Sequence, residues 1–287
     1  MSDTQDDAPL HHPFVLGIIG DSGSGKSTVS RGVRELIGAD RVSTLELDDY
    51  HRYSRAERLE LQLTALNPMV HNLSLMQEHL QLLRRGRPVR NRSYDHTDGT
   101  FGPPHTLEPQ EVVVVRGLLG FPTEELRACY DLTVFLYPEP DLLFRWKLRR
   151  DTKSRGYSEA EVLKSIARHL LDSKIYVLPQ ADRADLVVRY EVPDWDAPDT
   201  QVRTSLLLRR AAADAVRQNG VHGRFGEHVR FEEQDDGGGL VIHIDNTLPA
   251  ELVDAWGADL FPETYGNARF GLYQDEEGGE GRLVPLA

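Results

Sequence analysis

The sequence predicts an α/β protein with a mainly parallel β-sheet flanked by helices, followed by a C-terminal β-rich extension. Residues 14–20 (FVLGIIG) form a short continuous apolar run, which is typical of a buried parallel strand. A glycine-rich turn follows, and then four apolar residues recur with a helical period: Val29, Val33, Leu36 and Ile37. Four successive valines within residues 111–120 (EVVVVRGLLG) give the strongest strand signal. Strands that alternate with helices indicate βαβ units.

The same patterns predict the other elements of the first two thirds of the chain. Residues 41–49 (RVSTLELDD) are expected to form a second strand, and Met76, Leu80 and Leu83 mark a helix that ends at Gly86. Further strands are expected over residues 131–137 and 184–192, and two helices over residues 141–155 and 159–175.

The sequence predicts three parts: a flexible tail over 1–13, a core over 14–192, and an extension over 193–287 that ends in an acidic, mobile tail. A change of composition at residues 193–201 (PDWDAPDTQ) marks the boundary between the core and the extension. Residues 204–216 are compatible with a strand entering a helix, and the pattern leaves this open. Residues 228–234 and 240–246 are expected to be strands joined by a hairpin turn, and residues 249–256 a helix.

Composition narrows the class of protein. The chain has 287 residues, of which 39% are hydrophobic, and its net charge of −13 opposes non-specific binding to nucleic acid or an anionic membrane. The first ten residues are acidic and polar, and no apolar stretch approaches the roughly 20 residues that span a bilayer. The single cysteine, Cys129, excludes an internal disulfide and is expected to be a small buried group. We therefore expect a cytoplasmic protein with neither a nucleic-acid nor a membrane partner.

The turn after the first strand fits the phosphate-binding pattern GxxxxGK[ST]. Its glycines let backbone N–H groups surround a phosphate at a helix N-terminus, Lys26 would bridge the β- and γ-phosphates, and the Ser27 hydroxyl would bind Mg²⁺. We expect a P-loop NTPase-type fold that binds a nucleoside triphosphate through residues 20–28: Gly20, Asp21, Ser22, Gly23, Ser24, Gly25, Lys26, Ser27 and Thr28.

A second cluster of polar residues follows the second predicted strand, in LELDDYHRYSR (45–55). Ligands of open α/β sheets bind at the carboxyl ends of the strands. Asp48 at this edge could accept a proton from an acceptor hydroxyl, with His51, Arg52 and Arg55 supplying positive charge. A surface turn of mixed charge is the alternative.

Together with QADRADLVV (180–188) and RRDTKSRG (149–156), these segments resemble the phosphoribulokinase/uridine kinase family, and more closely its phosphoribulokinase branch. The resemblance implies MgATP-dependent phosphorylation of the 1-hydroxyl of ribulose 5-phosphate, a reaction of carbon fixation, by a homodimer. It implies that Asp48 is the catalytic base and also lies near Mg²⁺ with Ser27, and that His51 and Arg55 recognise the sugar phosphate. Uridine kinases typically carry Tyr where this chain has His51.

Two further segments match the family. Residues 94–101 (YDHTDGTF) resemble its acceptor-side loop, so Tyr94 and His96 are candidates to face the acceptor; an ordinary loop is the alternative. Four residues match a cationic lid over the transferring phosphate: Lys147, Arg150, Asp151 and Arg155. Helical spacing places the first three on one face, and a solvated stripe of charge is the alternative. The resemblance implies catalytic roles for these three and ATP binding for Arg155.

One position departs from the family pattern. After the four valines the family places Glu-Gly, with the Glu near Mg²⁺, but this chain has Arg116 and Gly117. Arg116 could bind phosphate or pair with Asp48 and lower its pKa. Three outcomes stay open: an active enzyme with Asp48 or Asp49 supporting the metal, an impaired enzyme, or an ATP-binding pseudokinase. A uridine or other small-molecule kinase is the enzymatic alternative. From the sequence alone, Arg116→Glu is expected to raise turnover.

Overall fold

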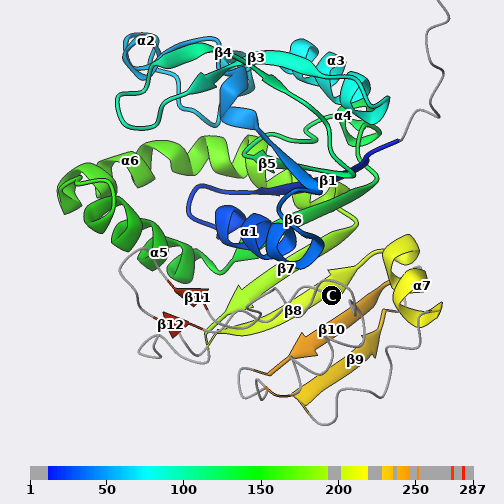
Figure 1. Ribbon diagram of the computed structural model, residues 1–287. Helices are drawn as coiled ribbons and strands as arrows, with labels where there is room; N and C mark the ends of the chain where they lie inside the picture. The colour runs from blue at the N-terminus through cyan, green and yellow to red at the C-terminus, as the bar shows by residue number, and fades with distance from the viewer. Residues whose placement is uncertain are drawn as a thin grey trace, which may run out of the picture.

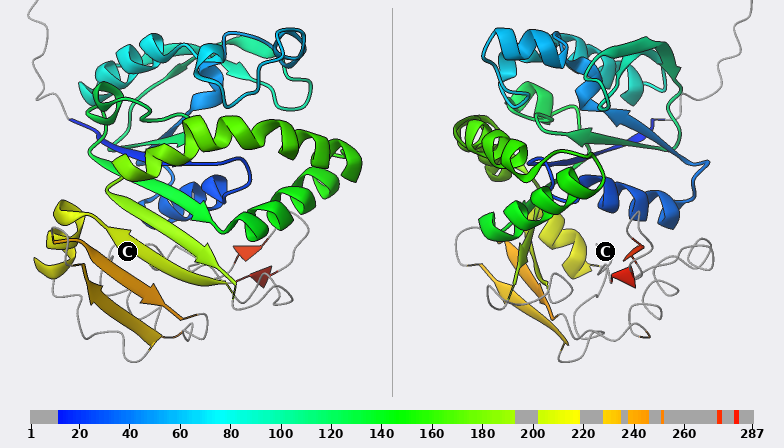
Figure 2. Two further views of the ribbon diagram at one scale, coloured as in Figure 1. Left: turned by 180° about the vertical axis from the view of Figure 1, so that it is seen from behind. Right: turned by 90° about the vertical axis from the view of Figure 1, so that its left-hand side faces the viewer.

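A computed structural model describes residues 12–192, 202–218, 228–234, 238–245, 251, 273–274 and 280–281. Within these ranges, no helix has the length and apolar character that crossing a bilayer requires. Figures 1 and 2 show a central sheet with the hairpin β3–β4 and helices α2 and α3 at one end of the molecule and strands β9 and β10 at the other.

Twelve strands and seven α-helices are described. The strands are β1 (Phe14–Gly20), β2 (Val42–Glu46), β3 (Val89–Tyr94), β4 (Phe101–Leu107), β5 (Val112–Gly117), β6 (Leu132–Pro138), β7 (Leu186–Glu191), β8 (Arg203–Leu208), β9 (Val229–Glu233), β10 (Leu240–Ile244), β11 (Tyr273–Gln274) and β12 (Glu280–Gly281). The α-helices are α1 (Lys26–Ile37), α2 (Arg55–Glu60), α3 (Leu73–Arg84), α4 (Glu124–Arg127), α5 (Pro140–Lys153), α6 (Glu159–Asp172) and α7 (Arg210–Gln218). Shorter turns are η1 (Leu47–Tyr50), η2 (Pro68–Val70), η3 (Ser173–Val177) and η4 (Leu178–Arg183).

Eight strands form one sheet in the order β2-β5-β1-β6-β7-β8-β10-β9. The neighbours from β2 to β7 pair in parallel, and β8, β10 and β9 continue the sheet with antiparallel pairing. The carboxyl ends of β2, β5, β1 and β6 therefore meet at one edge. The phosphate-binding segment follows β1 at this edge, and η1 follows β2 there.

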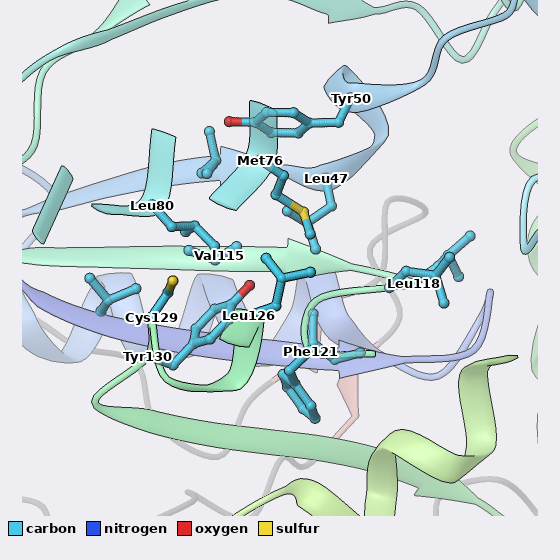
Figure 3. Packing of buried hydrophobic residues seen from close by; sticks show 14 of the residues in the cluster. Leu47, Tyr50, Met76, Leu80, Val115, Leu118, Phe121, Leu126, Cys129 and Tyr130 are labelled. Carbon is cyan, nitrogen blue, oxygen red and sulfur yellow. The ribbon is translucent and has the colours of Figure 1, made fainter. Parts of the chain in front are cut away.

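The alternation of side chains divides the core between the two faces of the sheet. On one face, Val113 and Val115 of β5 pack with Leu80 of α3 and Leu126 of α4. On the other face, Val114 packs in a cluster with Val29 of α1 and residues of α7. Figure 3 shows part of the first cluster, to which Leu47 and Tyr50 of η1 and Val115 of β5 all belong.

Helices α5 and α6 form a hairpin beside the carboxyl edge of the sheet, as both views of Figure 2 show. A capping box at Ser158 begins α6, because Ser158 and Glu161 bond each other's backbone N–H. Gly156, with φ +71°, lies in the link between the helices. Near the end of α5, Arg150 reaches Ser22 in the segment that follows β1.

The structure confirms the predicted α/β class and the mainly parallel sheet. It places a strand and then a helix in residues 204–216, where the sequence left the choice open, and it pairs β9 with β10 as the expected hairpin. Cys129 is buried, as expected. The strand expected over 41–49 ends at Glu46, and a short helical turn carries Asp48. The hairpin β3–β4 was not predicted.

Two expectations concern residues that are mostly outside the description. The tail over residues 1–13 is described only from residue 12, and the helix expected over 249–256 only at residue 251. Within the segment expected to be mobile, Gln274 and Glu280 belong to the short antiparallel pair of β11 and β12.

Candidate active site

The segment between β1 and α1 has the backbone of a phosphate-binding loop. Gly23 and Gly25 have φ angles of +92° and +93°, a left-handed conformation that residues with a Cβ rarely adopt. Lys26 Nζ donates to the carbonyl oxygens of Gly20 at 3.0 Å and Asp21 at 2.7 Å. The ammonium group therefore lies across the loop that the glycines form.

The N-terminus of α1 is prepared for an anion. Its first turn has no acidic residue, and the Gly25 cap supplies no side-chain hydrogen bond to the free N–H groups. The buried hydroxyl of Ser24 has no hydrogen-bond partner among the described residues. Free donors at a helix N-terminus match the phosphate oxygens of a nucleotide.

The charge on Lys26 depends on its surroundings. Burial lowers the pKa of Lys26 from 10.5 to about 8, and the positive charges of Arg150 and Arg116 lower it too, against the effects of Asp21 and Asp48. A bound anion would oppose these causes and favour the charged amine. The influence of Asp48 also shows that the expected base lies in electrostatic range of this lysine.

Helix α5 already lies against the loop. A methyl group placed on Gly23 would be 3.3 Å from Cβ of Lys147, so glycine permits the close approach of the helix. Arg150 Nη2 donates to Ser22 Oγ at 3.1 Å, and the Lys147 ammonium lies 3.5 Å from His169 Nδ1 on α6. Two predicted lid residues are therefore next to the predicted nucleotide-binding segment.

The carboxylate of Asp151 organises the arginines of this helix. Its Oδ1 accepts from Arg150 at 2.8 Å and pairs with Arg155 Nη1 at 3.4 Å. Asp151 itself is buried. This geometry gives Asp151 the means to position two cations.

The turn η1, which carries Asp48, is fixed by hydrophobic packing. Leu47 and Tyr50 are buried in the first core cluster (Figure 3). Gly117 lies directly against this turn, because a methyl group there would be 2.4 Å from Leu47 Cβ. Asp49 accepts from the backbone N–H of Tyr94 at 2.7 Å, which ties the turn to β3. The packing leaves Asp48 at the carboxyl edge of the sheet.

His96 is the partner of Asp48, with Nε2 3.1 Å from Oδ2. Burial would raise the pKa of Asp48, but the hydrogen bond with His96 and the influence of His51 and His71 together hold it well below its usual range. Asp48 is therefore ionised at neutral pH and can accept a proton. The sequence had suggested Arg116 as a partner of Asp48, but Arg116 is paired elsewhere.

His51 and Tyr94 lie together beside this carboxylate. Their rings stack with centroids 4.9 Å apart, and both side chains are buried. Burial lowers the pKa of His51 to about 3, so its ring is neutral at physiological pH. Nδ1 of His51 is buried with no hydrogen-bond partner among the described residues, which leaves one ring nitrogen able to bond a ligand.

Arg55 holds the loop that carries His96. Its guanidinium donates to the carbonyl oxygens of His96 and Thr97, and its backbone N–H donates to Gly99 at 2.8 Å. The structure thus engages Arg55 with the loop that was predicted to face the acceptor, and its role toward a substrate stays a prediction.

Arg58 is a residue that the sequence analysis did not identify. It is only 6% exposed, and it donates to the Tyr94 hydroxyl at 2.7 Å and the Tyr53 carbonyl at 2.8 Å. No carboxylate lies within ion-pair distance of it in the part of the chain that the structure describes. Its place one turn after Arg55 on α2 was visible in the sequence, but its burial was not. A buried cation without a counter-ion suits the binding of an anion.

Arg116 pairs with Glu46 across the carboxyl ends of two neighbouring strands. Its Nε lies 2.5 Å from Glu46 Oε1, and the two residues are register partners on β5 and β2. Glu46 has no sequence signal of its own, because its role depends on which residue faces it across the sheet.

The donor set fits a magnesium ion that is bound mainly through nucleotide. Ser27 at the start of α1 and Asp48 on η1 would supply oxygen atoms, which Mg²⁺ prefers. Within the described ranges, no group of three or more His, Cys, Asp or Glu residues is arranged to hold a metal by itself. Mg²⁺ typically keeps several waters and uses one or two protein oxygens with substrate phosphates, so two protein oxygens match its usual mode of binding.

Comparisons with known proteins agree with this geometry. A cyanobacterial phosphoribulokinase from Synechocystis is 35% identical over 180 residues, which cover 63% of this chain and 54% of the relative. A uridine kinase from Deinococcus deserti is 32% identical over 201 residues, 68% of this chain and 97% of that protein. The chain therefore spans about half the length of the Synechocystis enzyme and of the chloroplastic phosphoribulokinase of Spinacia oleracea.

The solved structure of phosphoribulokinase from Rhodobacter spheroides has the same fold, with a TM-score of 0.62 at 18% identity over 90% of this chain and 99% of that one. The model of the Phosphoribulokinase / Uridine kinase family matches residues 15–196, which contain the phosphate-binding loop, the η1 turn and the α5–α6 hairpin. By this match and by its sheet, the chain belongs to the phosphoribulokinase/uridine kinase family.

Proposed function

We propose that the chain transfers the γ-phosphate of ATP to an alcohol group of a small sugar phosphate, namely the 1-hydroxyl of ribulose 5-phosphate. The observation that carries this proposal is the placement of Asp48. Asp48 lies on η1 at the carboxyl edge of the sheet, where the segment that carries Lys26 also follows β1. Its carboxylate lies 3.1 Å from His96 Nε2, and its charge acts on the pKa of Lys26.

In the proposed reaction, Asp48 accepts the proton of the 1-hydroxyl as the oxygen bonds to the γ-phosphorus. The bond from that phosphorus to the β–γ bridging oxygen breaks, and ADP leaves. Lys26 and Arg150 offset the charge on the phosphates, while the lid residue Lys147 covers the loop at Gly23. Mg²⁺, held near Ser27 and Asp48, would neutralise charge on the β- and γ-phosphates.

The acceptor side favours a phosphorylated substrate. Arg58 is buried without a carboxylate partner among the described residues, Tyr94 lies beside it, and His51 stacks on Tyr94. A phosphate would supply the missing negative charge, whereas a nucleoside would leave the guanidinium uncompensated. We propose His51, Arg55, Arg58 and Tyr94 as the acceptor-binding set.

A nucleoside kinase is the second candidate, because the uridine kinase of Deinococcus deserti matches over nearly its whole length. The two candidates differ in what Arg58 contributes. For ribulose 5-phosphate, Arg58→Met should raise the acceptor KM, while for uridine the same change should leave it close to the original value.

The test is an ADP-release assay with MgATP and four separate acceptors: ribulose 5-phosphate, uridine, cytidine and pantothenate. We expect turnover with ribulose 5-phosphate that Asp48→Asn abolishes and that the exposed Asp40→Asn leaves unchanged. Turnover with uridine alone would instead support the nucleoside kinase. ATP binding without turnover on any acceptor would support a pseudokinase.

A further inference from the structure

The ion pair between Arg116 and Glu46 lies on the face of the sheet that α1 covers. Side chains alternate along β5, so Arg116 shares the face of Val114, which packs with Val29 of α1. Along β2, Glu46 shares the face of Val42, which belongs to the same cluster. Helix α1 begins with Lys26 and Ser27, so the pair lies at the same edge of the sheet as the predicted phosphate-binding residues.

The register of the strands places the pair close to the loop itself. Arg116 is the partner of Ile18 on β1, two residues before Gly20, where the phosphate-binding segment starts. Its positive charge contributes, after burial, to the lowered pKa of Lys26. The charge of Arg116 therefore acts in the same region of the site as the charges of Lys26 and Arg150.

The guanidinium of Arg116 is hydrogen-bonded through one of its three nitrogens. Only Nε bonds Glu46, and the two terminal nitrogens of Arg116 have no hydrogen-bond partner among the described residues. The side chain is 26% exposed, so these donors are accessible. An arginine whose Nε is fixed by a carboxylate presents its terminal N–H groups in a defined direction, as bidentate phosphate binding requires.

We propose that Arg116 binds the terminal phosphate of the nucleotide and that Glu46 is the positioning residue that holds it there. This inference rests on the proposed nucleotide site and extends it by one residue. Three cations then act on the phosphates: Lys26, Arg150 and Arg116. The alternative is a structural ion pair that only ties β2 to β5.

The same two strands offer a matched control. Arg41 and Glu111 form an ion pair of 2.6 Å at the opposite, amino ends of β2 and β5. If the Arg116–Glu46 pair is only structural, then replacing Arg116 and replacing Arg41 should have similar effects. Both changes should then affect only thermal stability.

The experiment is calorimetric titration of the full chain with ATP and with ADP, in EDTA and again in Mg²⁺ with a non-hydrolysable ATP analogue. For Arg116→Ala we expect the Kd of ATP to rise about tenfold to hundredfold while the Kd of ADP changes little. Arg116→Lys should keep part of the preference for ATP. Arg41→Ala should leave both Kd values unchanged.

Glu46 is tested through the same ratio of Kd values. Glu46→Ala should reduce the preference for ATP over ADP, whereas Glu46→Gln, whose amide oxygen still accepts from Nε, should retain most of it. In the Arg116→Ala background, Glu46→Ala should have no further effect on the ratio.

Equal changes for ATP and ADP, or none, in both Arg116 variants would overturn the inference and leave the nucleotide site intact. Absence of ATP binding by the unaltered chain would overturn the proposed function, and this inference with it. The two failures are therefore distinguishable in one set of titrations.

Discussion

His96 Nε2 lies 3.1 Å from the carboxylate of Asp48, and the two residues come from segments almost fifty positions apart. The hairpin β3–β4 delivers His96 to η1, and Arg55 holds its loop by donating to the His96 carbonyl. Asp48 is 24% exposed, so the contact leaves part of the carboxylate accessible. A base must be ionised and reachable, and this arrangement provides both.

The contact between His96 and Asp48 predicts how the activity depends on pH. With the pKa of Asp48 below its ordinary 3.8, its carboxylate should impose no acid limb on ADP release in the range from neutral to about pH 5. His96→Ala removes the hydrogen bond that lowers this pKa, so the limb should move to higher pH. His96→Gln, which keeps a neutral donor, should move it less. A limb that stays in place in both variants would contradict the assignment of Asp48 as the base.

Lys26 should couple the binding of a nucleotide to the uptake of a proton. In the free protein its pKa is about 8, and the phosphates of a nucleotide favour the charged amine. ATP binding above pH 8 should therefore take up a proton, and its Kd should rise as the pH increases. Calorimetry in two buffers of different ionisation enthalpy measures this uptake, and Lys26→Met should eliminate it.

The effect of Lys26 on stability has the opposite sign. Between its folded pKa of about 8 and its ordinary 10.5, the unfolded chain binds more protons at this position. Its contribution to the free energy of unfolding should therefore increase with pH in that window. Comparing urea unfolding of the original chain and Lys26→Met at pH 7 and pH 9.5 checks the sign.

Arg58 should contribute to the binding of a phosphorylated acceptor and not to the binding of ATP. Arg58→Met removes the buried cation, and we expect the KM for ribulose 5-phosphate to rise about tenfold or more, because hydrogen bonds to charged groups are worth roughly 1.5–3 kcal/mol. The KM for ATP should not change. Arg90→Met, an exposed change on the neighbouring hairpin, is the control. Equal effects of the two variants would show that Arg58 does not bind the acceptor.

Gly117 should be required for the position of the η1 turn. A methyl group there overlaps Leu47, and overpacking of this kind costs about 1–3 kcal/mol. Gly117→Ala should lower the free energy of unfolding and lower kcat more than it raises the KM for ATP. In the Leu47→Gly background, which removes the Cβ that the methyl group would meet, the added loss should be smaller.

The contact with Glu46 changes the expectation for Arg116→Glu. On sequence alone this substitution restores the acid of the family pattern and should raise turnover. In the structure it would place two carboxylates at adjacent strand ends, so we now expect it to lower ATP affinity. Glu46→Arg in the same chain should recover part of the loss, measured by the Kd of ATP.

The sequence predicts the fold well where a local pattern determines it. The apolar run of β1, the glycines of the loop and the amphipathic α1 are all local signals, and the structure has each of them. Lys147 and Arg150, which the family resemblance predicts to be lid residues, lie next to the loop.

The contacts between distant segments could not be predicted in the same way. The pairing of Arg116 with Glu46 depends on the register of β5 and β2, and the burial of Arg58 depends on the hairpin β3–β4. Neither has a local sequence signal, because each arises from elements that meet only in the folded sheet. The strand expected over 41–49 ends at Glu46, because Leu47 is apolar for a different reason: it packs a helical turn into the core.

The most direct test of the central claim is ³¹P NMR of a reaction that contains the chain, MgATP and ribulose 5-phosphate. We predict a new phosphomonoester signal that couples to the C1 methylene protons, with ADP formed in equal amount, and no such signal with Asp48→Asn. Two results would contradict the proposal. One is formation of ADP together with inorganic phosphate and without a new phosphomonoester. The other is a new phosphomonoester in a parallel reaction with uridine but not in the reaction with the sugar phosphate.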